Sequence, residues 1–465
     1  MKGKKTQFFL ILILLLFSLL YLPYINSFPY LDGNIDFVRS WRFFSGGLRE
    51  YFENDRTVHP PFKFFLVSLL FRVFGVNTFS YNLLGFLLGI AAIIFIFKLT
   101  RELFNAEIAK LATCFLAFYP LFLSAGIFSL ADYILTILII VSLYFYLKEK
   151  YSLYALVASL AFLTKETGLL IPVLVILVEA PYFLTEVLGI KKHQSLKKLP
   201  LFILPLMMAS FWFLILRLSG KKAWSDWIFS ETAEKGSFYT ILHNLLTFDF
   251  LNKYTYQHWL QFFFLNFNWI YCVFSIIGLT IFFKKGVNWL KIIKGLKEGD
   301  IKLKTFIIIF SFCFSYFLTV LTFQTYTIPR YALPIIPFLL ILTAFSARTI
   351  GEKFPAIKQL VVIFLFIIVV ISLFFSPDPL AKKIWGEEKV LGETLYAPNR
   401  HLAGNDGITY NFQYLFILKK RTAYLLNPQN QNKYECYWLF PDIRNDKVTL
   451  KVLNFRGVNP ESPCD

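Results

Sequence analysis

The residues best suited to chemistry in this sequence are the carboxylates of one polar stretch, residues 30–63, which directly follows the first apolar segment. The chain has 29 acidic residues against 47 basic ones, yet this stretch holds Asp32, Asp36, Glu50, Glu53 and Asp55. Carboxylates are costly to bring near lipid, so acids just past an apolar segment favour a functional site. A carboxylate placed there can accept a proton from a hydroxyl as a general base.

Asp32 and Asp36 lie one helical turn apart, so on a helix their side chains share a face. Paired acids can position a hydroxyl or hold a divalent cation. Spacing alone leaves other interpretations open. Asp32 could cap a helix or be a solvated loop acid, and Asp36 is equally consistent with a structural role.

Further candidates lie at the ends of later apolar segments. Asp132 opens one segment, where it or Ser129 could merely cap a helix, because acids favour the positive end of the helix dipole. Lys165 and Glu166 join two segments and could simply pair with each other. Arg330 is the first residue of RYALPIIP, directly before a Pro-rich segment, and could either extend to lipid headgroups or contact a lipid phosphate.

His59 stands directly before Pro60 and Pro61. A residue before proline favours an extended backbone, and proline suits the first turn of a helix. The motif therefore predicts a rigid turn followed by a helix over 62–75. That helix is short for a membrane span and contains Lys63 and Arg72, so we expect it to lie at the outer membrane surface.

The elements that must position these residues are apolar segments. The chain of 465 residues is 57% hydrophobic and only 16% charged, with a mean hydropathy of +0.58, whereas soluble domains are about a quarter charged. Runs of about 20 apolar residues, the length that crosses a bilayer, recur along the chain. The sequence therefore predicts an all-α polytopic membrane protein.

About eleven spans are predicted. They fall near 8–25, 80–98, 109–124, 131–147, 152–164, 168–186, 200–217, 260–283, 305–323, 331–347 and 359–375. With the N-terminus in the cytoplasm, every second loop is rich in Lys and Arg, as the positive-inside rule requires. One of these inner loops runs from Lys284 to Lys304. The net charge of +18 is thus explained by topology rather than by nucleic-acid binding.

The remaining segments are then outside. The first outer loop is 26–79, the second large one is 218–259, and residues 376–465 form a small α+β extracytoplasmic module. The five cysteines are scattered and have no zinc-binding spacing. Asp32, Asp36, His59, Asp132, Lys165, Glu166 and Arg330 all gather on the outer face.

Charges at one membrane boundary favour chemistry over transport, because transporters more often place polar groups near the bilayer midplane. A transporter or flippase of lipid-linked saccharides remains the alternative. A membrane scaffold without activity has no reason to gather acids and bases on one face.

The order of these motifs resembles the GT-C superfamily of polyprenyl-phosphate-sugar glycosyltransferases. It is most similar to the branch that includes protein O-mannosyltransferases and the aminoarabinose transferases of lipid A. Over residues 30–350, Asp32 stands at the family's acidic position and Gly46-Gly47 at the expected distance. His59-Pro60-Pro61 follows. Gly33 stands where the family has Glu, so the role of Asp36 is open.

The resemblance implies an inverting glycosyltransferase in residues 1–375 that moves a sugar from a polyprenyl-phosphate donor to a glycan, lipid or protein hydroxyl. It implies Asp32 as base, with Asp132 orienting the base or the acceptor. Three residues would meet the donor phosphate: His59, Lys165 and Arg330. Asp36 and Glu166 complete the expected substrate site. No cofactor is required, and a divalent cation is compatible. We expect a multi-pass protein of the plasma membrane, with the site outside.

Overall fold

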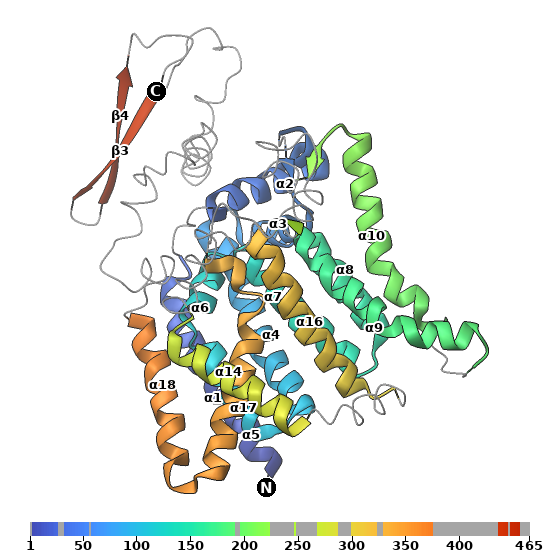
Figure 1. The fold of residues 1–465 in the computed structure, drawn as a ribbon. Coiled ribbons are helices and arrows are strands. Elements are labelled where there is room, and N and C mark those ends of the chain that lie inside the picture. Colours follow the sequence, from blue (N-terminus) through green and yellow to red (C-terminus); the bar gives the residue numbers. More distant parts are fainter. Residues whose placement is uncertain are drawn as a thin grey trace.

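The computed structural model describes residues 2–26, 32–54, 57–190, 196–223, 246–247, 267–286, 299–322, 329–374, 436–444 and 447–455. These residues are almost entirely helical (Figure 1). Most of the loop expected at 218–259 and of the module expected at 376–465 lies outside the described residues. After residue 374, only the hairpin of strands β3 (Cys436–Arg444) and β4 (Lys447–Phe455), paired antiparallel, is described.

A helix occupies each segment in which the sequence predicts a span. The main helices are α1 (Lys2–Tyr21), α4 (Thr78–Leu103), α5 (Ala106–Ala117), α6 (Pro120–Ile127), α7 (Ala131–Leu147), α8 (Tyr151–Thr164), α9 (Leu170–Val187), α10 (Leu199–Leu218), α14 (Trp269–Gly286), α16 (Ile301–Thr322), α17 (Ile336–Lys353) and α18 (Lys358–Phe374). Within the described residues, six helices are long and apolar enough to cross a membrane, or seven if α5 and α6, bent by 55°, form one span. The protein is therefore an integral multi-pass membrane protein, and eleven spans remain a prediction.

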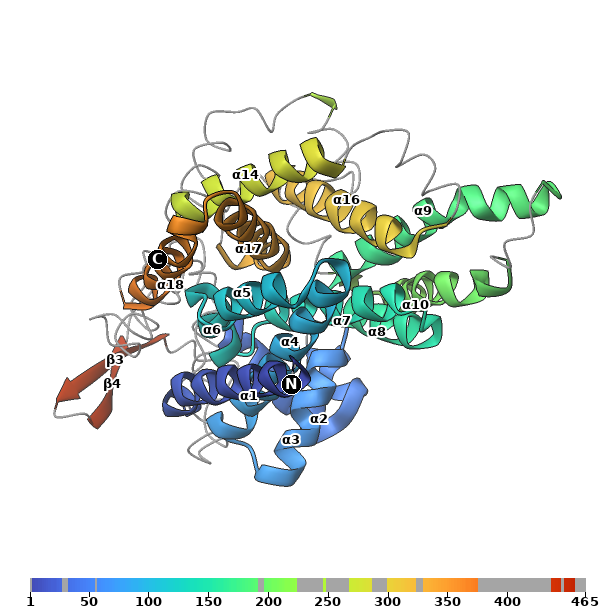
Figure 2. The ribbon, with the colours of Figure 1, turned by 90° about the horizontal axis from the view of Figure 1, so that it is seen from below.

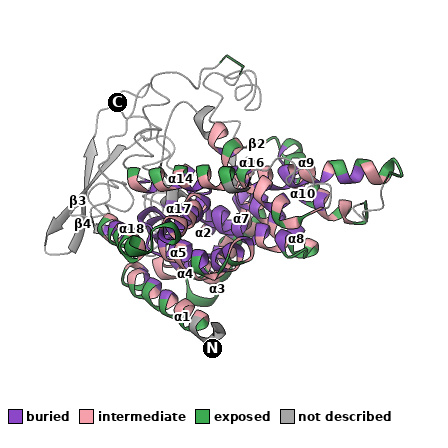
Figure 3. Ribbon diagram, turned by 60° about the horizontal axis from the view of Figure 1, so that its bottom comes forward, coloured by how far each residue is buried: buried purple, intermediate pink, exposed green. Residues whose placement is uncertain are grey.

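The core of the bundle is built on α7, whose residues are almost all buried and which packs against α4, α6, α8 and α16 (Figures 2 and 3). Helices α1, α10 and α18 carry many exposed apolar residues. That distribution suits helices that face lipid at the rim while α7 is enclosed by protein.

Two helices fill most of the predicted first outer loop, 26–79: α2 (Asp32–Asn54) and α3 (Phe62–Phe74). Gly47 interrupts α2 with φ 65° and ψ −152°, a conformation that favours glycine. Helix α3 buries Lys63, Phe64, Val67, Ser68 and Phe71 on one face. Its N-cap is Pro61, so the predicted turn and helix start after His59 are confirmed.

A short parallel pairing ties this loop to a distant helix. Strand β1 (Thr57–Val58), just before His59, pairs with β2 (Lys222–Ala223), just after α10. Below it, Tyr51, Phe64, Phe162 and Trp212 form a separate small core with their neighbours. The end of α2, the start of α3 and the ends of α8 and α10 are therefore held at one end of the bundle (Figure 1).

Candidate active site

A buried cluster of one carboxylate and two cations lies at that end of the bundle. Asp132 comes from the first turn of α7, Lys165 from the residue that follows α8, and Arg330 from a 3-10 turn, η6 (Pro329–Ala332). Lys165 Nζ donates to Asp132 Oδ1, and Arg330 Nε lies 3.6 Å from Asp132 Oδ2. Three predicted site residues from distant parts of the chain thus form one contact group.

The ring of Tyr331 lies beside both cations of this group. Lys165 Nζ is 4.5 Å and the Arg330 guanidinium carbon 5.2 Å from the ring centroid. Cations are attracted to the face of an aromatic ring at these distances. Arg330 is buried, with 5% of its side chain exposed, so the interpretation that it extends to headgroups is wrong.

Tight packing between α4 and the start of α7 fixes the position of Asp132. The Ser129 hydroxyl donates to the carbonyl of Tyr81 and accepts the N–H of Gly85. Tyr133 donates from its hydroxyl to the carbonyl of Gly85. Ser129 is therefore tied to α4, and the N-cap of α7 is Leu130, which makes no side-chain cap. The capping interpretation of Ser129 is wrong.

Opposing effects act on the ammonium group of Lys165. Burial by itself lowers the pKa of Lys165, but the carboxylate of Asp132, with Tyr331, outweighs burial and raises the pKa above its ordinary value. Lys165 is therefore a permanent cation at physiological pH.

His59 and Glu166 form a second contact beside the first. His59 Nδ1 lies 3.5 Å from Glu166 Oε1, and Tyr51 donates from its hydroxyl to the His59 carbonyl at 2.7 Å. Lys165 and Glu166 are adjacent in sequence, but each forms its ionic contact with a residue of another element instead of with its neighbour. The His-Pro-Pro turn is anchored to the turn between α8 and α9.

Asp36 belongs to a different contact, with Lys63 of α3. Lys63 Nζ donates to Asp36 Oδ2, and both side chains are buried. Lys63 also lies 5.6 Å from the ring centroid of Tyr81 on α4. The sequence interpretation counted Lys63 only as a charge in an apolar helix. Its position in the sequence gives no signal for this contact, because the direction of its side chain depends on how α3 packs against α2.

Asp32 is the first residue of α2, one turn before Asp36 on the same helix. The position of its side chain lies outside the described residues. Because Asp36 is pinned to α3, the start of α2 is fixed relative to α3 and α4. Asp32 therefore begins a helix that is anchored one turn later.

The residues that the sequence predicts thus fall into separate contacts. Asp132, Lys165 and Arg330 carry a net charge of +1, and Asp36 is neutralised by Lys63. Within the described residues, no group of three His, Cys, Asp or Glu side chains could hold a metal ion. The site is a charged group with one excess positive charge, an arrangement that can bind an anion.

Residues 58–214 match the family model described as dolichyl-phosphate-mannose-protein mannosyltransferase. This match confirms the predicted resemblance to GT-C membrane glycosyltransferases over that part of the chain. It includes His59, Lys63, Asp132, Lys165 and Glu166. No curated protein matched the sequence.

Solved structures with similarity to this chain include the following two. ArnT from Cupriavidus metallidurans, bound to undecaprenyl phosphate, is 15% identical, with a TM-score of 0.45; the match covers 89% of this chain and 75% of that one. The archaeal oligosaccharyltransferase AglB from Archaeoglobus fulgidus, in complex with an inhibitory peptide and a dolichol-phosphate, is 13% identical, with a TM-score of 0.49, over 89% and 60%.

Proposed function

We propose that this protein is an inverting glycosyltransferase that moves a sugar from a polyprenyl-phosphate donor to an acceptor hydroxyl at the outer face of the membrane. The observation that carries the proposal is the buried group of Asp132, Lys165 and Arg330, two of whose members lie in the family-matched residues. Three elements supply this group, and it has one more positive charge than negative.

The chemistry of the donor explains that charge. A polyprenyl-phosphate sugar is a phosphodiester with one negative charge, and the polyprenyl phosphate that leaves has a second. A fixed excess of positive charge in a buried site stabilises the charge that develops on the leaving group. Lys165 and Arg330 supply two cations for this purpose, while Asp132 holds both in place and prevents their mutual repulsion.

The proposed step is a single displacement. The acceptor oxygen bonds to the anomeric carbon as the bond from that carbon to the phosphate oxygen breaks, and the electron pair leaves with the phosphate. Asp32 accepts the proton of the acceptor hydroxyl. His59 and Glu166 flank the donor phosphate on the side of the His-Pro-Pro turn. The step as written needs no metal ion.

Asp36 is assigned a structural role. Its carboxylate already accepts a hydrogen bond from the buried Lys63 ammonium group, so it is engaged in a contact between α2 and α3. Gly33 stands where the family has Glu, and Asp36 therefore does not replace that Glu as a second base. Asp32 acts alone in the proposed mechanism.

The proposal is tested with purified protein and a synthetic short-chain polyprenyl-phosphate sugar. We expect release of polyprenyl phosphate that requires an acceptor, and mass spectrometry of envelope glycans with and without the protein should identify that acceptor. Movement of the intact donor between leaflets, with no release of polyprenyl phosphate, would instead establish the flippase alternative.

A further inference from the structure

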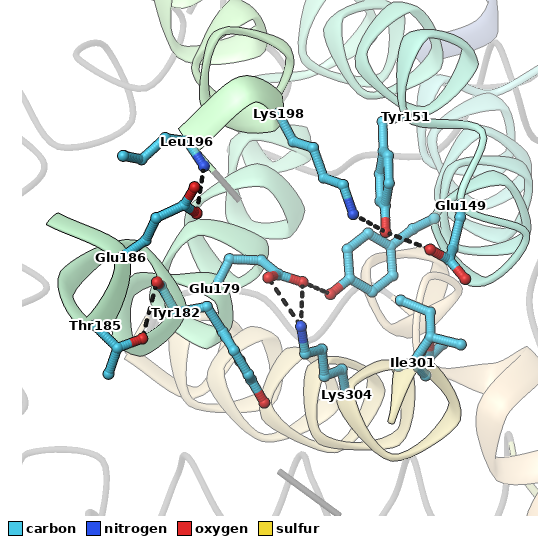
Figure 4. A network of polar contacts seen from close by, with 12 residues as sticks. Glu149, Tyr151, Glu179, Tyr182, Thr185, Glu186, Leu196, Lys198, Ile301 and Lys304 are labelled. Atoms are coloured by element: carbon cyan, nitrogen blue, oxygen red, sulfur yellow. Dashed lines mark hydrogen bonds and ion pairs between the residues drawn. The ribbon is translucent and has the colours of Figure 1, made fainter. Parts of the chain in front are cut away.

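Another buried ionic contact lies between α9 and α16, near the end of α7 opposite to Asp132 (Figure 4). Lys304 Nζ donates to both carboxylate oxygens of Glu179, at 3.1 and 3.0 Å. The hydroxyl of Tyr146, near the end of α7, donates to Glu179 Oε1. Lys304 Nζ also lies 3.6 Å from the centroid of the Tyr182 ring. Four side chains from three helices meet here.

This contact is not the surface feature that the sequence suggested. Lys304 was assigned to a basic inner loop, yet it lies inside α16, with 9% of its side chain exposed, and Glu179 has 5% exposed. Both residues fall within helices apolar enough to span a membrane. Buried ion pairs add little net stability compared with apolar packing, because desolvation offsets their attraction. Their best-attested use is to fix one register between helices.

Helix α16 connects this contact to the candidate active site. Tyr316 lies about three turns beyond Lys304, roughly 18 Å along the helix at 1.5 Å per residue. Tyr316 is buried beside Thr167. Helix α16 also packs against α7 and η6, the elements that supply Asp132 and Arg330. An axial shift of α16 at Lys304 therefore moves Tyr316 at the site.

We propose that Glu179 and Lys304 form a register lock, an ion pair that fixes the axial position of α16 relative to α7 and α9. It thereby also fixes the position of Tyr316 at the candidate site. Apolar faces of packed helices offer several registers, one turn or about 5.4 Å apart. A single Glu–Lys–Tyr contact satisfies all its polar groups in only one of them. Glu179 and Lys304 are thus positioning residues, far from the reacting atoms.

The lock is tested by cross-linking in a background with the native cysteines replaced. Thr167→Cys is combined in turn with Tyr316→Cys, Phe312→Cys or Thr319→Cys, and a short bifunctional thiol reagent is added. With the native Glu179–Lys304 pair, Thr167→Cys should form the cross-linked product mainly with Tyr316→Cys. Lys304→Met alone leaves a buried carboxylate and should lower Tm by about 5 °C or more.

The decisive variant combines Glu179→Leu and Lys304→Leu with Tyr146→Phe, so that no buried polar group of this contact is left without a partner. We expect this apolar pair to recover the Tm but to lose the preference for Tyr316→Cys, with products from Phe312→Cys or Thr319→Cys. The exchanged pair, Glu179→Lys with Lys304→Glu, should recover both the Tm and the cross-linking preference for Tyr316→Cys. An apolar pair that keeps the original cross-linking preference would overturn the proposal, because packing alone would then set the register.

An exposed pair provides the control. Glu107 and Lys110 on α5 form an ion pair at 3.4 Å, with 56% and 28% of their side chains exposed. Changing both to Leu should leave Tm and the cross-linking pattern unchanged. Cross-linking does not depend on catalysis. The register proposal can therefore be overturned while the proposed glycosyltransferase activity is confirmed, and the activity can be overturned while the register proposal is confirmed.

Discussion

Arg330 lies directly against Asp132, with its Nε 3.6 Å from the carboxylate Oδ2 and only 5% of each side chain exposed. Asp132 belongs to the family-matched residues, whereas Arg330 comes from the C-terminal half of the chain. The candidate site is therefore incomplete without the second half of the bundle. Lys165 on the other side of Asp132 makes the carboxylate the shared partner of two cations.

Arg330→Ala should weaken use of the donor. Loss of a charge-assisted contact to phosphate costs about 1.5–3 kcal/mol, which corresponds to roughly a 10- to 150-fold loss in donor affinity or turnover. The measurement is donor binding and transfer rate with purified protein. Arg217→Ala, at an exposed position in the last turn of α10, is the matched control. Unchanged kinetics in Arg330→Ala would remove this residue from the site.

Asp32→Asn should abolish transfer while the protein remains folded and inserted. The change keeps the size of the side chain but removes the base, and general-base catalysis typically contributes about 10²–10⁴ in rate. Donor binding, measured in parallel, should change little, because the phosphate contacts lie elsewhere. If Asp32→Asn keeps most of its activity, the base is a different residue.

Asp36→Asn should reduce stability more than it reduces chemistry. Without its carboxylate the buried ammonium of Lys63 loses its charged partner, and breaking a buried ion pair costs about 3–5 kcal/mol. Thermal unfolding in detergent measures this loss. Asp36→Leu combined with Lys63→Met should recover much of the stability, since no buried charge then remains unpaired. A stable Asp36→Asn protein that lacks activity would instead identify Asp36 as the base.

Gly85→Ala should destabilise the contact between α4 and α6 that underlies Asp132. A Cβ at Gly85 would lie 1.9 Å from the carbonyl oxygen of Gly126 and 2.6 Å from the hydroxyl of Tyr21. Overpacking of this kind typically costs about 1–3 kcal/mol. Leu87→Ala, at an exposed position on the same helix, is the control. Equal Tm values for the two variants would show that α4 can move away at no cost.

Topology can be tested at two exposed positions. An impermeant thiol reagent added to intact cells should label Ser219→Cys, which lies at the site end of α10, and spare Glu107→Cys, at the start of α5. The parent protein gives the baseline for native cysteines. This outcome follows from the alternation of basic loops. The reverse pattern would place the site in the cytoplasm, where nucleotide sugars would replace the polyprenyl donor.

The sequence by itself determined the membrane class, the places of the helices and the turn after His59. Hydrophobic length and proline act locally, so runs of apolar residues and Pro60-Pro61 are sufficient to predict them. It also indicated which charged residues need a partner in the fold, because an ionisable group at the end of an apolar helix is costly without one. Asp132, Lys165, Glu166 and Arg330 were found in this way.

Only the tertiary structure decided which residue pairs with which. Neither Lys165 with Asp132 nor Glu166 with His59 could be read from spacing, since the pairing of distant residues depends on how helices pack. Neither Lys63 nor Lys304 differs in the sequence from other basic residues, because sequence position does not show the direction in which a side chain points. Packing turned both toward buried acids, Asp36 and Glu179, since a charge enclosed by helices is stable only beside its opposite.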